Sequence, residues 1–491
     1  MTSTSSTSAT FPTHAATPHA SPGHPPTLAP TAGFADLHDE VRLASLPVRG
    51  VVPTWLTGSL LRTGPAQWDT DQKTLRHWFD GFAMLHSFGI KNGNVSYANR
   101  MLESESYKYA RDNGKIGFSE FATDPCRSLF KRVQSIFSPA LGDNANVNLV
   151  QLGEHYISMT ETAIAVEFDA HTLETVGVAY TAPGMVTTAH PHLNRKGNGK
   201  GLLNYAAKLG ARNEYRFYEL TADDLEPKIV ARKAVREPAY MHSFGLTENY
   251  IVLAEFPFVV NPATIALSGR PYIENFKWKP ERGTKFTLFR RDDGTIAHEF
   301  TADPYFAFHH VNAFELGGEV IVDICAFEDA SLIDQLYMDR LRDGQPTTAN
   351  PHLHRFILNT KTGKATSAQI SDVSLELPRI NYARCNERPY NYVWGAGIGD
   401  SGWFDQINKI EIDQGESLTW QANGCFPGEP VFVANPDATG EDGGVLLSVV
   451  FDASNETSFL LILDAATMVE LARADVPHHI PFGFHGQFAK R

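Results

Sequence analysis

The sequence predicts an all-β fold in which several sheets are arranged around one axis. Two observations support this prediction. First, 38 glycines and 29 prolines among 491 residues separate many short apolar runs, as turns separate strands. Second, a hairpin pattern recurs in which a polar side chain occupies a similar place on the first of two strands. Such a repeat is typical of radial arrays of sheets, which bring equivalent positions together at the axis.

The clearest copy of this hairpin runs from Phe306 to Ile324. Its first strand carries His309 among aromatic residues, and an apolar strand returns after a turn at Gly317 and Gly318, which supply the positive φ angles of tight hairpins. A histidine in such a strand is usually a core residue bonded to backbone. We therefore give weight to the recurrence of the pattern rather than to this one residue.

Two further hairpins repeat the pattern with a different polar residue or turn. One carries His242 before a short polar turn at 247–249, and the other carries Glu429 before a longer turn that ends at 442–444. The repeat is degenerate in sequence, but each copy places an imidazole or a carboxylate on the strand that comes first. Equivalent strands in a radial array would bring these groups to one axis.

Composition limits the domain organisation and the class of protein. Residues 1–33 are mostly Ser, Thr, Pro and Ala without a charged side chain, which predicts a disordered tail before a single domain at 34–491. The net charge of −14 argues against a nucleic-acid partner. Four cysteines without C-x-x-C spacing are typical of thiols in a reducing compartment, and no apolar run reaches the ~20 residues of a membrane span. We therefore expect a cytoplasmic location.

Two segments have helical periodicity. Residues 124–137 begin with Asp–Pro and place apolar side chains on one face beside basic ones, so two interpretations stay open: a short helix over the core, or a basic amphipathic helix in peripheral contact with a membrane. The second segment, from Ser331 to Asp343, is expected to be one structural helix that ends at Gly344. Its apolar face consists of Leu332, Ile333, Leu336 and Leu341.

Seven side chains are candidates for a metal site. The imidazoles are those of His190, His242, His309 and His485, and the carboxylates are those of Glu161, Glu376 and Glu429. No local motif such as H-E-x-x-H is present, so their sequence spacing alone does not show a site. If the blades bring them together, imidazoles without cysteine suit Fe, Cu or catalytic Zn rather than structural zinc. The carboxylates could then accept the second N–H of the imidazoles, although for each glutamate alone a solvated position at a strand edge is the more common interpretation.

With these residues in view, the chain resembles the carotenoid cleavage oxygenases, most closely the animal β-carotene oxygenase and retinoid isomerase branch. The matching motifs follow one another along nearly everything beyond the tail. They are Gly58–Pro65, His77–Gly81, Asp124–Cys126, Thr160–Thr162, the region of Pro389 and Tyr390, and His485–Gly486. The resemblance implies a seven-bladed β-propeller with a helical and loop cap over the metal site.

The resemblance also implies a cofactor and a reaction. One Fe(II) per chain would be bound by His190, His242, His309 and His485, with Glu161, Glu376 and Glu429 as their outer partners. The family places one ligand three residues before an asparagine, and Asn312 therefore favours His309 over His310. The implied reaction adds O2 across a conjugated C=C bond of a carotenoid or apocarotenoid and gives two aldehydes. No catalytic acid or base beyond the metal centre is expected.

Three alternatives stay open at this point. A retinoid isomerohydrolase would use the same ligands, and a non-enzymatic lipid-binding propeller would not need all four histidines. The stilbene-cleaving branch has a lysine where this chain has Thr160, which favours an apolar substrate. We expect aromatic side chains to line the substrate tunnel. Phe258, Tyr305 and Trp394 are candidates, and ordinary core packing is at least as common an explanation for each of them.

Overall fold

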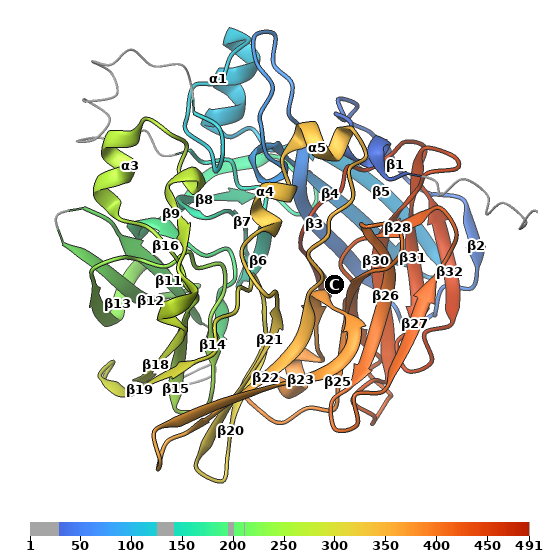
Figure 1. Cartoon of the computed structure of the whole chain (residues 1–491). Helices are drawn as coiled ribbons and strands as arrows, with labels where there is room; N and C mark the ends of the chain where they lie inside the picture. Colours follow the sequence, from blue (N-terminus) through green and yellow to red (C-terminus); the bar gives the residue numbers. More distant parts are fainter. Residues whose placement is uncertain (1–28, 125–141, 195–200, 211, 491) are drawn as a thin grey trace, which may run out of the picture.

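The strands form a ring of seven blades (Figure 1). The computed structural model describes residues 29–124, 142–194, 201–210 and 212–490. Within these ranges the strands make six large sheets and one two-stranded sheet. The eight-stranded sheet contains two blades, joined where β9 (Thr175–Thr187) pairs with β11 (Gly201–Lys208). The predicted all-β propeller is confirmed.

The first three blades contain β33 and the strands from β1 to β13, except for β2, which belongs to the seventh blade. The first consists of β33 (Gly486–Lys490), β3 (Gly58–Gln67), β4 (Phe82–Lys91), β5 (Asn94–Met101) and β1 (Arg42–Leu43). The second consists of β6 (Asn148–Leu152), β7 (His155–Met159), β8 (Thr162–Phe168) and β9. The third consists of β10 (His192–Asn194), β11, β12 (Asn213–Thr221) and β13 (Asp224–Val235).

The other four blades follow in chain order. The fourth consists of β14 (Gly245–Leu246), β15 (Tyr250–Glu255), β18 (Thr284–Arg290) and β19 (Ile296–Ala302), and the fifth of β20 (His310–Leu316), β21 (Glu319–Ala326), β22 (His352–Asn359) and β23 (Lys364–Ser374). The sixth consists of β24 (Glu376–Arg379), β25 (Tyr392–Ile398), β26 (Phe404–Glu411) and β27 (Ser417–Gln421). The seventh consists of β28 (Cys425–Pro427), β29 (Val431–Ala434), β30 (Gly444–Asp452), β31 (Thr457–Asp464), β32 (Glu470–Asp475) and β2 (Val48–Gly50). A separate two-stranded sheet pairs β16 (Phe258–Val259) with β17 (Lys277–Trp278).

The ring is closed by segments from opposite ends of the chain. β33 pairs antiparallel with β3, in a register that runs from Gly58 opposite Lys490 to Arg62 opposite Gly486. β2 pairs in the same way with β32 of the seventh blade. The propeller is therefore completed by hydrogen bonds between strands more than 400 residues apart in the sequence.

The three predicted hairpins are present as β20–β21, β14–β15 and β29–β30. The turn of the first contains Gly317 and Gly318 with φ of +64° and +93°, the backbone region expected there. Apolar side chains fill the space between neighbouring blades. Leu446 and Leu461 of the seventh blade, for example, pack in one cluster with Trp394 of the sixth.

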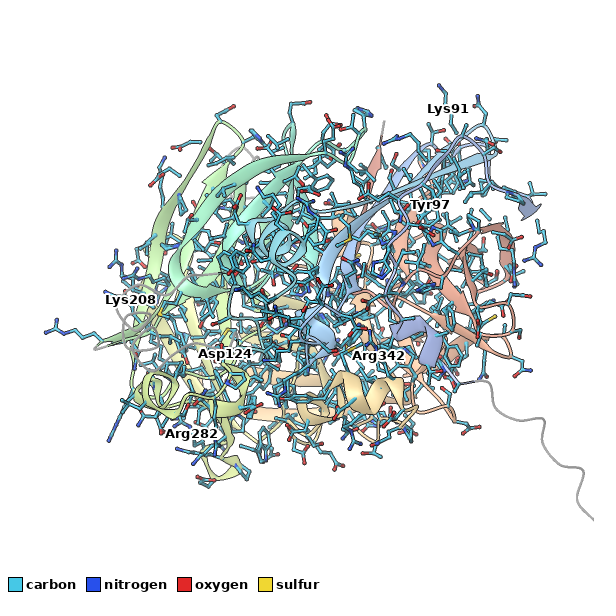
Figure 2. The ribbon with its side chains drawn as sticks, turned by 90° about the horizontal axis from the view of Figure 1, so that it is seen from above. Lys91, Tyr97, Asp124, Lys208, Arg282 and Arg342 are labelled. Carbon is cyan, nitrogen blue, oxygen red and sulfur yellow. The ribbon has the colours of Figure 1, made fainter. Side chains whose placement is uncertain are left out.

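Short helices connect the strands, and several of them cover one end of the ring. They are η1 (Thr31–Phe34), η2 (Trp78–Asp80), α1 (Glu105–Asn113), α3 (Pro262–Ser268), η3 (Ile273–Asn275), η4 (Pro280–Arg282), α4 (Leu332–Gln335), α5 (Met338–Arg342) and α6 (Tyr382–Cys385). Helices α1, α3, α4 and α5 lie toward the same end, at the top of Figure 1. Seen from that end, Arg342 of α5 lies at the surface, where it forms ion pairs with Asp36 at 2.8 Å and Asp69 at 3.0 Å (Figure 2).

The single helix predicted at Ser331–Asp343 is wrong, because the structure contains two shorter helices. All four predicted apolar residues are buried and Gly344 has φ of +71°, but Tyr337 between α4 and α5 is extended, with ψ of 139°. The backbone at this break forms hydrogen bonds with residues 76 and 78 instead of continuing the helix. Trp78 N donates to Leu336 O at 3.0 Å, and Met338 N donates to Arg76 O at 2.8 Å. The helical periodicity does not reveal this pairing with a distant segment.

Some expectations fall on residues outside the described ranges. These are residues 1–28 of the predicted tail, Cys126, and nearly all of the segment 124–137. No helix of the described ranges is both long and apolar enough to cross a membrane. Cys325 and Cys425 are buried free thiols, as expected from their spacing.

Candidate metal centre

Four imidazoles converge at one point on the propeller axis. The nitrogens of His190, His242, His309 and His485 that face this point all lie within 4.8 Å of one another. Nε2 of His190 is 3.0 Å from Nε2 of His242, and Nε2 of His309 is 3.1 Å from Nε2 of His485. Within the described part of the chain, this is the one cluster of three or more potential ligands.

Each histidine stands just ahead of the first strand of a blade. His242 precedes β14, His309 directly precedes β20, His485 directly precedes β33, and His190 lies two residues before β10. The prediction that His309 and His242 lie on their strands is therefore wrong by one to three positions. His309 still bonds to the next strand, because its carbonyl accepts from Cys325 N at 3.0 Å.

Three of the imidazoles bind a carboxylate through the nitrogen that faces away from this point. His242 Nδ1 donates to Glu161 at 2.6 Å, His309 Nδ1 to Glu376 at 2.5 Å, and His485 Nδ1 to Glu429 at 2.7 Å. Glu376 begins β24, and Glu429 lies two residues before β29. Glu161 lies in the turn between β7 and β8 rather than on a strand. The structure thus brings all seven candidate residues together.

These pairs determine what the centre can bind. A proton held on Nδ1 by a carboxylate leaves the lone pair on Nε2, and the Nε2 atoms face one another at close range. Facing lone pairs without a donor between them repel and are stabilised by a cation. The donor set, neutral nitrogens backed by carboxylates, therefore fits a transition-metal ion.

The electrostatics of the centre favour this protonation state. Burial and the three neighbouring imidazoles hold the pKa of His190 well below its usual range. Burial lowers the pKa of His242 despite its contact with Glu161, and it lowers the pKa of His485 to about 3 despite Glu429. These imidazoles are therefore neutral at pH 7, and a metal ion does not have to displace a proton from them.

The three carboxylates have different additional partners. Glu161 also accepts from the hydroxyl of Tyr240 at 2.7 Å, and Glu376 accepts from Leu377 N at 2.6 Å, while its other oxygen has no hydrogen-bond partner among the described residues. Glu429 accepts from Arg379 Nε at 2.8 Å. Although burial raises the pKa of Glu429, Arg379 and His485 more than offset this effect and hold it well below its usual range.

Sequence reasoning missed Tyr240 and Arg379. Tyr240 stands two residues before His242, and Arg379 three residues after Glu376. The only signal in the sequence is that each lies within three residues of a candidate site residue, and many other residues do so as well. The choice of His309 over His310 agrees with the geometry, because His310 is not part of the cluster and its Nδ1 lies 2.8 Å from Ser243 Oγ.

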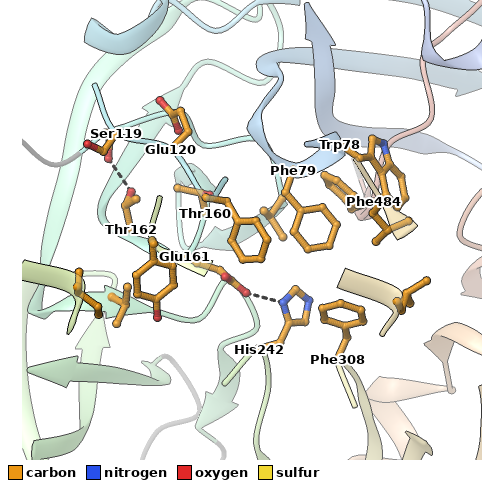
Figure 3. A pocket seen from close by; sticks show the side chains of 18 of the residues that line it. Trp78, Phe79, Ser119, Glu120, Thr160, Glu161, Thr162, His242, Phe308 and Phe484 are labelled. Carbon is orange, nitrogen blue, oxygen red and sulfur yellow. Dashed lines mark hydrogen bonds and ion pairs between the residues drawn. The ribbon is translucent and has the colours of Figure 1, made fainter. Parts of the chain in front are cut away.

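A cavity of about 970 Å³ opens onto the metal centre. His242, His309 and His485 form part of its wall, and the cap forms much of the rest. Figure 3 shows the Glu161–His242 pair at this wall, with the rings of Phe79, Phe308 and Phe484 beside it. Further apolar lining residues are Trp78, Phe121, Val147, Met185, Leu209, Ile265, Tyr272, Phe327, Leu332, Leu336 and Trp403. The volume and the lining suit a large apolar ligand.

The three aromatic residues predicted to line the tunnel do not line this cavity. Trp394 is in the core between two blades and stacks on Phe432, with ring centroids 4.8 Å apart. Tyr305 packs on His354, with centroids 4.7 Å apart. Phe258 packs on Phe276, with centroids 5.3 Å apart. Strand alternation gives the face of a blade, but it does not tell whether that face meets the cavity or the neighbouring blade.

Comparison with known proteins agrees with this geometry. The family model described as retinal pigment epithelial membrane protein matches residues 34–490. The β,β-carotene 15,15′-dioxygenase of Mus musculus is 33% identical over 90% of this chain and 88% of its own length. The mitochondrial carotenoid-cleaving dioxygenase of Mustela putorius furo is 32% identical over 94% of this chain and 96% of its own length.

The fold has a counterpart among solved structures. A variant of the Synechocystis apocarotenoid oxygenase superposes with a TM-score of 0.84 over 94% of this chain and 98% of the other, at 24% identity. That likeness shows the propeller fold alone. Taken with the family match over 34–490 and the identity to full-length relatives, it leaves one assignment: the chain belongs to the carotenoid oxygenase family, described as retinal pigment epithelial membrane protein.

Proposed function

We propose that this protein is a non-haem Fe(II) dioxygenase that cleaves a conjugated C=C bond of a carotenoid or apocarotenoid. The observation that carries the proposal is the convergence of four histidines on the wall of a large apolar cavity. The balanced reaction is R–CH=CH–R′ + O2 → R–CHO + R′–CHO, in which each aldehyde receives one oxygen atom from O2. The names of the relatives support the substrate class.

In this proposal one Fe(II) per chain is bound by His190, His242, His309 and His485. Iron would supply the activation of O2, since imidazole ligands suit Fe(II) and leave no charge of their own on it. A cobalt-substituted form of the Synechocystis enzyme is among the similar structures, and iron is the ion we propose for this chain. The roles of Glu161, Glu376 and Glu429 are to fix the tautomer and orientation of three imidazoles.

The other side chains of the site bind and shield the substrate. The aromatic and aliphatic wall of the cavity holds a polyene with one double bond at the metal centre, and it excludes water from the reacting atoms. Phe308 contacts His242 with ring centroids 5.2 Å apart, so the apolar wall reaches the ligands themselves. The overall reaction neither releases nor takes up a proton, and the proposal assigns no acid or base of the protein to it.

An experiment with isotopically labelled oxygen tests the proposal. The iron-loaded protein is incubated with β-carotene, an apocarotenal and a retinyl ester under ¹⁸O2, and the products are identified by mass. We expect two aldehydes from one polyene, each with one ¹⁸O. Retinol free of ¹⁸O from the ester alone would instead indicate an isomerohydrolase. Binding of polyene without any product would indicate a lipid-binding propeller.

The stilbene-cleaving alternative is tested in the same assay with a hydroxystilbene. Thr160 lies in the cavity wall beside Glu161, and its hydroxyl carries no charge with which to bind a phenolate as a lysine does. We therefore expect polyenes to be cleaved in preference to stilbenes. The reverse preference would overturn the substrate class while leaving the iron site in place.

Two expectations about location stay predictions from the sequence. One of the relatives is named mitochondrial, so the family alone does not assign this chain to the cytoplasm. The membrane contact expected for 124–137 falls outside the described residues except for Asp124, which lines the cavity. Fractionation of cells, followed by vesicle flotation of the purified protein, tests both expectations.

A further inference from the structure

His485 differs from the other histidines of the centre in its position in the fold. It directly precedes β33, the strand that closes the propeller against β3. Its partner Glu429 is also different, because among the described residues it is the only one of the three carboxylates that forms an ion pair with an arginine. The arginine of this ion pair, Arg379, has no role in the proposed function.

Arg379 joins His485 to the sixth blade. From β24, its Nε donates to Glu429 Oε1 at 2.8 Å and its Nη2 donates to the carbonyl of Gly486 at 2.5 Å. The same carboxylate accepts from His485 Nδ1 at 2.7 Å and from Gly486 N at 2.9 Å. The planar guanidinium group thus holds both the carboxylate that orients the imidazole and the backbone beside it.

Arg62 holds the other side of His485. It lies on β3 directly opposite Gly486, is only 5% exposed, and donates from Nη2 to the carbonyl of Phe484 at 3.2 Å. Its alkyl chain fills the space beside Gly486, where a Cβ atom would lie 2.6 Å from Arg62 Cγ. The two carbonyls that flank His485 are therefore each held by a different arginine.

We propose that Arg379 and Arg62 are positioning residues for His485, which couple closure of the propeller to retention of the metal ion. This inference rests on the proposed function in one respect, namely that the four histidines bind a metal. Without the arginines, Glu429 is a buried carboxylate with fewer donors, and the carbonyls of 484 and 486 lose their side-chain partners. The imidazole then samples orientations in which Nε2 no longer points to the other three.

The test measures metal retention rather than turnover. The protein is loaded with Co²⁺, whose visible absorption bands report ligand geometry, and the rate of cobalt release to a chelator is followed for Arg379→Gln, Arg379→Lys and Arg62→Lys. Arg355→Gln is the matched control. Arg355 also donates from Nε and Nη2, to the two oxygens of the buried Asp323 at 2.8 Å each, and its side chain is 21% exposed against 29% for Arg379. It contacts no histidine of the centre.

We expect Arg379→Gln to release cobalt about 10–100-fold faster than the native protein, with shifted absorption bands. Arg379→Lys should be intermediate, because an ammonium group keeps the charge but cannot reach both Glu429 and the carbonyl of Gly486. Arg62→Lys should also release cobalt faster. Arg355→Gln should lower the melting temperature and leave the release rate and the bands unchanged.

Each outcome bears on one of the two proposals. Equal release rates for Arg379→Gln and Arg355→Gln would overturn the positioning role and leave the metal site intact. If Arg379→Gln does not fold, Arg379→Lys and Arg62→Lys decide, and native rates in both would overturn the inference. Failure of the native protein to bind cobalt, iron or zinc would overturn the proposed function itself. Combination of Arg379→Gln with Glu429→Gln should add little to either change, because both act on His485.

Discussion

His309 shows most directly how the contacts of one side chain determine its role in the metal centre. Its Nδ1 is fixed by Glu376 at 2.5 Å, and its Nε2 faces that of His485 at 3.1 Å, so the ring has one orientation and one tautomer. His310, its neighbour, is turned to Ser243 instead. Two adjacent histidines thus have different roles, because at the start of β20 their side chains point in different directions.

The variant His309→Ala should lose iron and activity together, since one of the four nitrogens is removed. Metal analysis of the purified protein and product formation from a polyene check this prediction. His310→Gln is the control, and we expect it to retain iron. Full iron occupancy in His309→Ala would show that the ion does not need this ligand.

The variants Glu161→Gln, Glu376→Gln and Glu429→Gln should each reduce metal affinity or activity by ~10–100-fold, because an amide binds the Nδ1 proton less strongly than a carboxylate. The fold should persist, as judged by circular dichroism. If all three variants have native kinetics and iron content, the carboxylates are only strand-edge residues and have no role at the metal centre.

At the scale of elements, the hairpins and the candidate histidines are predictable from the sequence, but the position of each histidine relative to the start of its strand is not. The turn at Gly317–Gly318 is predictable because glycine adopts positive φ angles without steric strain, and a tight hairpin turn requires such angles. The position of His309 before β20 depends on where pairing with β21 begins, which is a tertiary property. For the same reason the break between α4 and α5 was not predictable, since it arises from bonds to Arg76 and Trp78.

The ligand set itself was named through resemblance to a family. Spacing alone gave no site, because the four histidines come from four different blades. For the cavity wall, the sequence predicts only the class of side chain. The wall is aromatic, but its residues, which include Phe79, Phe308 and Phe484, are not Phe258, Tyr305 and Trp394. Which aromatic side chains reach a cavity depends on how the cap folds over the ring.

The closing strand gives a prediction at this scale. Gly486→Ala places a Cβ atom 2.6 Å from Arg62 Cγ and 2.7 Å from Leu61 O, so we expect a loss of roughly 1–3 kcal/mol in stability together with faster metal release. Chemical unfolding and chelator assays measure the two effects. Gly317→Ala is the comparison, because it strains a residue at φ of +64° in open space, costs about 1 kcal/mol, and should leave metal release unchanged. Equal release rates in the two variants would contradict this reading of Gly486.

At the scale of the whole molecule, buried neutral histidines determine the response to acid. Burial lowers the pKa of several far below the usual 6.5: His77, His86, His310 and His485 to about 3, and His192 to about 4. Between about pH 3 and 6.5 the unfolded chain therefore binds more protons at these groups than the folded one. Asp80 and Glu120 act in the opposite sense, since burial raises their pKa, but they are fewer.

The free energy of unfolding of the metal-free protein should therefore fall as the pH falls below 6.5, by about 1.4 kcal/mol per pH unit for each net proton taken up. Urea unfolding at pH 7, 5.5 and 4.5 measures this slope. A constant free energy across that range would mean that the buried histidines are already protonated in the folded state.

The closure of the ring by β33 has a consequence for biosynthesis. His190, His242 and His309 leave the ribosome long before His485, so an ion that reaches the nascent chain meets at most three of the four imidazoles. Three imidazoles with vacant positions form a ligand set that zinc readily accepts. In the proposed iron enzyme, the fourth imidazole, which distinguishes this centre from a three-histidine zinc site, would therefore become available only after translation reaches His485.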